Sequence, residues 1–408
     1  MIQIITKRGQ EGAPRFNVSI RQGTNFMMDP AGRLGTMWTC PESESPGTCE
    51  TEEELVSYNM YEEANRYIQE GYFDWPTENL YSYGRAQGYN LDVAGGAQAI
   101  RYFVSANYDT EAGSAWYNTD ETFRLRGNLG VIFNDYLSLD VSSGFVDGST
   151  RFEGSTIGDG GLWQDMVWSN GYYLDRITPF DSPTSRNPNP RLGGFQEHLP
   201  ADVAETEGTR DFSRFTGSAT LNFVVPEIDL GVTTAGINSR AVVGIDKGWD
   251  VNRLLFLAED GIVPEHLRQY TDEWSSVYSE TETGEMTYER PISTNLTFDY
   301  SLSASLDLGE AFGSQTSFGA QYYTSSVDEF ANSGNGFASP LSKTINQLSQ
   351  PQMTTEYSYT ENKSLGFYVQ QEVSFRDRLF LTGAMRFDDN STFGTDAPAI
   401  RYPKVSGA

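Results

Sequence analysis

The sequence predicts an all-β protein, and within that class a transmembrane antiparallel β-barrel. Apolar and polar residues alternate over many segments of about 10 to 14 residues, which is the pattern of strands with one apolar and one polar face. The links between these segments are alternately short and long. A soluble sandwich need not sort its links by end, whereas an outer-membrane barrel has short periplasmic turns and long outer loops.

The first alternating segment is PRFNVSIRQ at 14–22, where Phe16, Val18 and Ile20 oppose Asn17 and Ser19. The same pattern returns at 100–108, 123–129, 136–145, 214–223 and 295–308. We count about eleven strands from residue 14 onward, with a twelfth beginning near RYPKVSGA at 401–408.

The segment 295–308 has the clearest alternation, with apolar residues at the even positions and Asn, Thr, Asp or Ser at the odd ones. It predicts that Leu302 and Leu306 face lipid, while Ser303 faces a lumen that holds water or a plug.

The links follow the same logic. Short turns are expected at 134–136, 309–314 and 376–378, and long loops at about 23–87, 148–210, 249–290 and 327–361. One helix is predicted, at 51–71 inside the first long loop. Thr51 and Glu54 form a capping box there, and Gly71 ends the helix. Its expected role is to fold that loop over the barrel mouth, in preference to a binding role.

Composition narrows the possible partners. The net charge is −28, with 28 Lys and Arg against 56 Asp and Glu, which argues against nucleic acid as a ligand. The acidity is expected to keep long polar loops hydrated. The alternative is capture of a divalent cation such as calcium, or of a cationic ligand. No other cofactor is predicted.

Two cysteines, Cys40 and Cys49, lie in the first long loop, separated by eight residues that include two prolines and a glycine. Such a segment can fold back and close a disulfide in an oxidising compartment. The alternative is two unpaired thiols. The spacing excludes a CxxC metal pair.

No catalytic constellation is visible, so the sequence does not predict an enzyme. His198 and His266 are isolated, and the chain has no HExxH, GxSxG or GxxxxGK[ST] motif. Aromatic residues in the second long loop, Trp163, Trp168 and Tyr172, are candidates for contact with a sugar or a peptide. Their alternative place is the aromatic belt at the membrane interface.

Three stretches resemble TonB-dependent outer-membrane receptors of the SusC/RagA-like branch. MIQIITKRG resembles the last plug strand before the barrel, with matches at Ile4, Thr6, Lys7 and Gly9. Residues 102–129 resemble an early hairpin with an arginine-rich return strand. The third block, GAMRFDDNSTFG followed by RYPKVSGA, resembles a mid-barrel signature. Its matching positions are Arg386, Asp388, Asn390, Ser391, Phe393, Gly394, Pro403 and Ser406; Asp389, Tyr402 and Lys404 depart from the family pattern.

The resemblance implies that residues 1–12 end a plug domain and that 13–408 form the first half of a barrel of roughly 22 strands. The chain would then be a fragment of a receptor in the outer membrane of a Gram-negative bacterium. The implied function is import of an oligosaccharide or peptide, held by plug and loops. The implied partners are outer-membrane lipid, a SusD-like lipoprotein, and the TonB complex, which would engage a region before residue 1. The alternative is a secreted all-β carbohydrate-active enzyme or adhesin.

Overall fold

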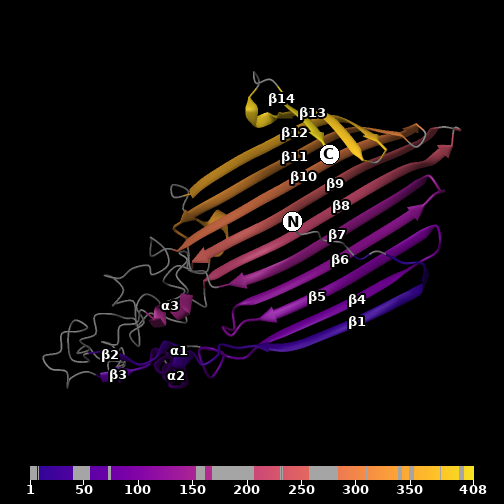
Figure 1. The fold of residues 1–408 in the computed structure, drawn as a ribbon. Coiled ribbons are helices and arrows are strands. Elements are labelled where there is room, and N and C mark those ends of the chain that lie inside the picture. The colour runs from indigo at the N-terminus through magenta and orange to yellow at the C-terminus, as the bar shows by residue number, and fades with distance from the viewer. Residues whose placement is uncertain are drawn as a thin grey trace.

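The computed structural model describes residues 7, 9–39, 56–71, 75–152, 161–167, 206–229, 231, 233–256, 284–308, 311–338, 342–348, 353–376, 378–394 and 399–408. Twelve strands form one curved antiparallel sheet, in which neighbours along the chain are neighbours in space (Figure 1). These strands are β1 (Gly12–Asn25), β4 (Gly84–Gly96), β5 (Ile100–Ala112), β6 (Thr119–Ile132), β7 (Leu137–Phe152), β8 (Glu207–Asp229), β9 (Thr233–Phe256), β10 (Glu285–Leu308), β11 (Phe312–Asn335), β12 (Met353–Phe375), β13 (Leu379–Asn390) and β14 (Ile400–Gly407). The sheet order runs from β1 to β14, so the predicted all-β meander is confirmed.

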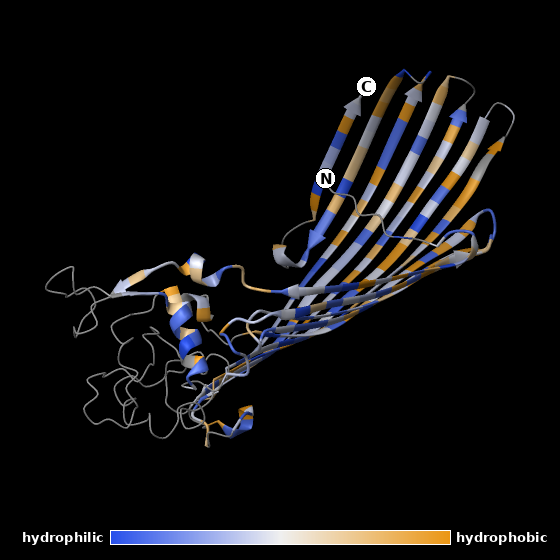
Figure 2. Ribbon diagram, turned by 90° about the horizontal axis from the view of Figure 1, so that it is seen from below, coloured by the Kyte–Doolittle hydropathy of each residue, from blue (hydrophilic) through white to orange (hydrophobic). Residues whose placement is uncertain are grey.

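The residues that alternate in the sequence point to opposite faces of the sheet, one apolar and one polar. Figure 2 shows apolar and polar residues alternating along the strands. Leu302 lies opposite Phe318, while the next residue, Ser303, lies opposite Ser317, and their hydroxyl oxygens are 3.0 Å apart. The face that carries Leu302 is called the apolar face below, and the face that carries Ser303 is called the polar face.

The apolar face has the height of a membrane. On β10 its apolar residues run from Leu296 to Leu308. A strand rising about 3.4 Å per residue covers about 40 Å over those twelve steps, and a tilt of about 45° leaves about 28 Å. That height is close to the apolar band of about 25 Å on outer-membrane barrels.

The strands extend further than the sequence predicts. Strands β8 to β12 contain 23 or 24 residues each. The long links are therefore 26–83, 153–206, 257–284 and 336–352, and the last two are clearly shorter than predicted. On β11 and β12 the pairing continues past polar residues of the apolar face, such as Asp328 and Glu361, so hydropathy no longer marks the strand there. The three predicted short turns are confirmed, between β6 and β7, β10 and β11, and β12 and β13.

The predicted helix begins later than expected. Helix α2 spans Met60–Gln69, while Val56–Tyr58 form strand β3, which pairs with β2 (Met37–Thr39). The cap is Asn59, whose Oδ1 accepts hydrogen bonds from the backbone N–H groups of Tyr61 (3.1 Å) and Glu62 (3.3 Å). The start predicted at Thr51 is therefore wrong, and the Thr51–Glu54 capping box lies outside the described residues. Gly71 follows the helix with φ 81°, as its predicted role as terminator requires.

The buried apolar clusters of the described residues lie in and beside the long links. One joins α2 with α3 (Gly161–Val167) and includes Met60, Ala64 and Leu162. Helix α1 (Pro30–Leu34) lies beside it, with Leu34 packed against the cluster. A second cluster joins β9 and β10 to the link 336–352 through Leu255, Met286, Phe337 and Leu348. Among the described residues, no helix is long and apolar enough to cross a membrane.

Candidate functional site

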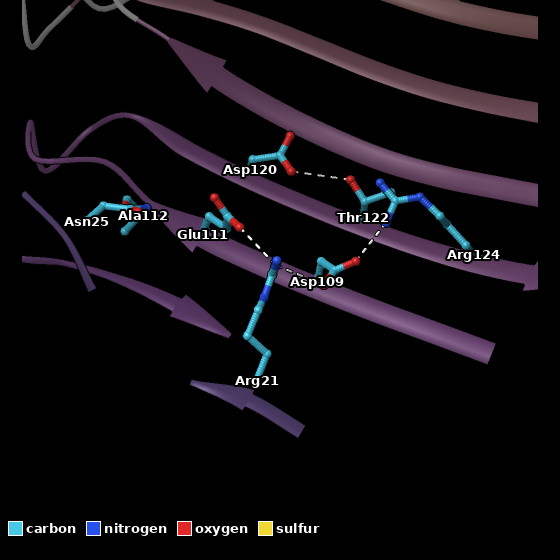
Figure 3. A network of polar contacts seen from close by, with 8 residues as sticks. All are labelled: Arg21, Asn25, Asp109, Glu111, Ala112, Asp120, Thr122 and Arg124. Carbon is cyan, nitrogen blue, oxygen red and sulfur yellow. Dashed lines mark hydrogen bonds and ion pairs between the residues drawn. The ribbon is translucent and has the colours of Figure 1, made fainter. Parts of the chain in front are cut away.

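Oppositely charged side chains connect the strands across the polar face. Arg21 on β1 contacts Asp109 (3.2 Å) and Glu111 (3.1 Å) on β5, and Asp109 also accepts a hydrogen bond of 2.7 Å from Arg124 on β6 (Figure 3). Asp109 is thus shared by two arginines that lie on either side of it. The sequence indicates an arginine-rich strand at β6 but does not predict this ladder, because the pairing depends on the order of the strands.

A glycine makes the bridge over β4 possible. Gly88 lies opposite both Arg21 and Asp109 in the register. A Cβ atom at Gly88 would lie 2.6 Å from Asp109 Oδ1 and 3.2 Å from Arg21 Nε. The arginine can therefore reach across β4 only because position 88 has no side chain.

Further ion pairs continue the pattern on the strands that follow. Arg214 on β8 pairs with Asp246 on β9, and Arg210 pairs with Asp250 at 2.6 Å. These pairs are half-exposed, so each contributes little to stability on its own. Together they make the polar face a wall of fixed charges rather than a packed core.

The mid-barrel signature forms a local network on the same face. Arg386 Nε donates to both carboxylate oxygens of Asp388 (2.8 and 2.9 Å), and its Nη2 donates to Gln321 on β11 at 3.0 Å. Gln321 in turn donates to Asp299 on β10 at 2.7 Å. The network thus spans from β13 to β10.

The rest of that signature shapes the end of β13. Asn390 caps the single turn Ser391–Phe393, and Ser391 Oγ accepts a hydrogen bond of 2.9 Å from the backbone N–H of Lys363 on β12. Gly394 follows with φ 85°, a conformation that favours glycine. Pro403 lies on β14 opposite Met385.

The segment before β1 crosses the polar face. Asn128 Nδ2 on β6 donates a hydrogen bond of 2.6 Å to the carbonyl oxygen of Lys7, and the Lys7 ammonium lies 3.7 Å from Asp92. Gly9 packs so closely that a Cβ atom would lie 2.3 Å from the backbone nitrogen of Tyr102. The remaining matched residues of this segment, Ile4 and Thr6, lie outside the described residues.

Several predicted site residues lie outside the part of the chain that the structure describes: Cys40, Cys49, Trp168 and Tyr172. The disulfide therefore stays a prediction. Trp163 is on α3 and packs, partly buried, against the cluster around α2. Among the described residues, no three His, Cys, Asp or Glu side chains converge as a metal site. Calcium binding by the loops likewise stays a prediction.

A cluster of charged residues connects the link 336–352 to the ends of β8 and β9. Glu207, at the start of β8, accepts hydrogen bonds of 2.8 Å from both Lys343, in the link 336–352, and Arg253 on β9. Burial raises the pKa of the Glu207 carboxyl, but the Lys343 hydrogen bond and the charges of Lys343, Arg253 and Arg151 lower it by more. The pKa of Glu207 therefore lies below its ordinary value of 4.5.

This cluster predicts that acid loosens the link. A carboxylate with a lowered pKa stabilises the folded form fully above about pH 4.5, and that contribution is lost as the pH falls through the lower folded-state pKa. We expect Glu207→Gln to cost about 1 kcal/mol and to remove this pH dependence. Hydrogen exchange of the amides at 342–348, corrected for intrinsic rates, would measure it. Glu361→Gln is the control, because Glu361 pairs with Lys363 on its own strand. Unchanged pH dependence in Glu207→Gln would contradict the assignment.

A curved antiparallel meander with an apolar band, an ion-paired opposite face, short turns at one end and long links at the other is the wall of an outer-membrane β-barrel. The chain belongs to the TonB-dependent receptors: residues 205–407 match the family described as "TonB dependent receptor-like, beta-barrel". Members of this family are outer-membrane receptors and not enzymes.

Solved structures agree with this fold. The chain is similar to the RagAB peptide importer in its closed-closed state, with 15% identity, a TM-score of 0.60, and coverage of 98% of this chain and 45% of that one. Similarity to the open-open state gives 14% identity, a TM-score of 0.61, and 98% and 44% coverage. The chain therefore spans less than half the length of these relatives. No curated protein matches the sequence.

Proposed function

We propose that this chain forms the end of the plug and the first half of the barrel of an outer-membrane receptor. The receptor would import a bulky nutrient, a peptide or an oligosaccharide, across the outer membrane. The observation that carries this proposal is the pairing of an apolar face of bilayer height with an ion-paired face. A wall of that kind separates lipid from a wet lumen. The polar face would line the path of the substrate.

The boundary between the two proposed parts lies near Gly12. Lys7 and Gly9 lie across the polar face, where they contact Asn128 and the backbone of Tyr102, whereas β1 joins the sheet as a strand. The sheet is open, with β1 and β14 at its two edges. Unpaired strand edges are not tolerated in hydrocarbon, which supports closure by further strands.

We also propose the partners that the resemblance implies. A SusD-like lipoprotein would cover the outer mouth near the long links, and the TonB complex would supply energy through the plug. Support comes from the family match and from the similarity to a structure described as a peptide importer. Uptake of labelled peptides and of labelled oligosaccharides distinguishes the two substrate classes.

Import can be tested in the bacterium that carries the gene. Deletion should abolish energy-dependent uptake of labelled peptides or of labelled oligosaccharides, and the intact gene should restore it. The protein should be recovered in the outer-membrane fraction. Uptake that is unchanged by deletion, or insensitive to a protonophore, would overturn the proposal. Recovery of a folded protein in the aqueous phase of a detergent extraction would favour the secreted alternative.

A further inference from the structure

We propose that the polar face carries a groove that binds a carboxylate of the substrate, and that Arg126 is the residue that contacts it. The inference rests on the proposed import function and adds the chemical class of the substrate. The groove lies on β6, β7 and β8 and has a volume of about 600 Å³. Arg124 and Arg126 form one wall, and Arg214 forms the other.

The floor of the groove combines Val146, which lies between Arg124 and Arg214, with smaller residues beside it. Arg126 lies opposite Gly144 on β7, and Gly144 lies opposite Thr216 on β8. A Cβ atom at Gly144 would lie 2.8 Å from Thr216 Oγ1, so a larger residue there would crowd the floor. Ser142 and Ser218 continue the floor along the strands and offer hydroxyl groups to a bound ligand.

The three arginines of the groove differ in whether they have a carboxylate partner. Arg124 donates to Asp109 at 2.7 Å, and Arg214 Nε donates to Asp246 at 2.7 Å. Arg126, by contrast, makes no hydrogen bond or ion pair with any residue that the structure describes. It is half-buried, and Arg124 and Arg214 line the same groove in a chain of net charge −28. A guanidinium in that position is a ready partner for a planar anion.

The ligand chemistry follows from the arginine. Its planar fork of N–H donors matches a carboxylate, and it repels cationic groups. The carboxylate can come from a peptide or from an acidic sugar, since both offer the same planar group. A neutral substrate would leave Arg126 without a partner.

The experiment measures binding to the complete detergent-solubilised receptor, using two matched pairs of probes. The first pair is a short neutral peptide with a free C-terminal acid and the same peptide as its C-terminal amide. The second is a galacturonic acid oligomer and a galactose oligomer. In at least one pair, the acidic probe should bind about tenfold more tightly than the neutral one, because a charge-assisted hydrogen bond in a wet lumen has about that effect.

Substitutions assign this preference to a residue. Arg126→Gln should reduce the ratio to about one, and Arg126→Lys should retain part of it because the charge remains. Arg240→Gln is the matched control, since Arg240 lies on the polar face of β9, between Asn222 and Ser301, and is not among the groove residues. Heat-modifiability on a gel confirms that each variant is folded.

Two results would overturn the groove. One is equal binding of acidic and neutral probes by the unsubstituted receptor in both pairs. The other is an acid preference that survives Arg126→Gln. If the Arg126→Gln variant were also cleaved more readily before Gly12 than the unsubstituted receptor, Arg126 would pair with a carboxylate of the receptor itself. The two proposals can fail separately. If the probes bind as expected but deletion of the gene leaves uptake unchanged, the import function is wrong and the groove stands.

Discussion

An arginine in place of Leu302 is expected to destabilise the complete barrel by about 2 to 4 kcal/mol, whereas an arginine at the next residue, Ser303, costs little. Leu302 lies midway along the apolar run Leu296–Leu308, opposite Phe318 on β11 and Ser239 on β9. A charge there would face hydrocarbon at the midplane. Ser303 lies on the polar face beside Ser317, where water can solvate the guanidinium.

The measurement is a urea titration of refolding into phosphocholine bilayers. Leu302 and Ser303 are adjacent in the chain, so the difference in unfolding free energy between Leu302→Arg and Ser303→Arg reports only which face of the sheet carries the arginine. Leu296→Arg, at the edge of the apolar run, should cost only about 0 to 1 kcal/mol and so reports depth. Equal losses for Leu302→Arg and Ser303→Arg would show that the assignment of the two faces is wrong.

The success of the strand prediction has a simple physical origin. Side chains in a strand point alternately to opposite faces, so Leu302 and Ser303 reveal their faces without knowledge of any other strand. The predicted turns succeed for a related reason, because the alternation stops at each of them. Near the outer strand ends this signal fails. Asp328 on β11 and Glu361 on β12 lie on the apolar face, yet they are polar, so the alternation loses its contrast there.

The polar face was less predictable. Arg21 and Asp109 are 88 residues apart, and they meet only because β4 places Gly88 between them. That contact depends on strand order and on a glycine whose importance a single sequence does not show. The start of α2 was missed for a local reason. Asn59 is a good cap, but the apolar stripe continues before it through Leu55 and Tyr58, and the structure places Val56–Tyr58 in a strand.

Replacing Gly9 by alanine is expected to lower the free energy of unfolding of the complete receptor by about 2 to 5 kcal/mol. The new Cβ would lie 2.3 to 2.6 Å from the backbone N, O and C atoms of Tyr102, and a paired strand backbone cannot yield as a flexible side chain can. The segment must therefore lift away from β5. Overpacking costs about 1 to 3 kcal/mol, and losing the hydrogen bond to Lys7 leaves the buried Asn128 unpaired at a similar cost.

A double-mutant cycle distinguishes this displacement from a local clash. Asn128→Ala alone removes the 2.6 Å hydrogen bond to the Lys7 carbonyl without crowding Gly9. If Gly9→Ala already lifts the segment, Asn128→Ala should have little further effect in the double variant, and the two losses should not add. Gly23→Ala is the control, because its Cβ would come no closer than 3.8 Å to any neighbour, the Cβ of Ala86. Denaturant unfolding gives each free energy. Additive losses would mean that Lys7 keeps its hydrogen bond to Asn128 in Gly9→Ala while the wall beneath Gly9 deforms, and the expected displacement of the segment would be wrong.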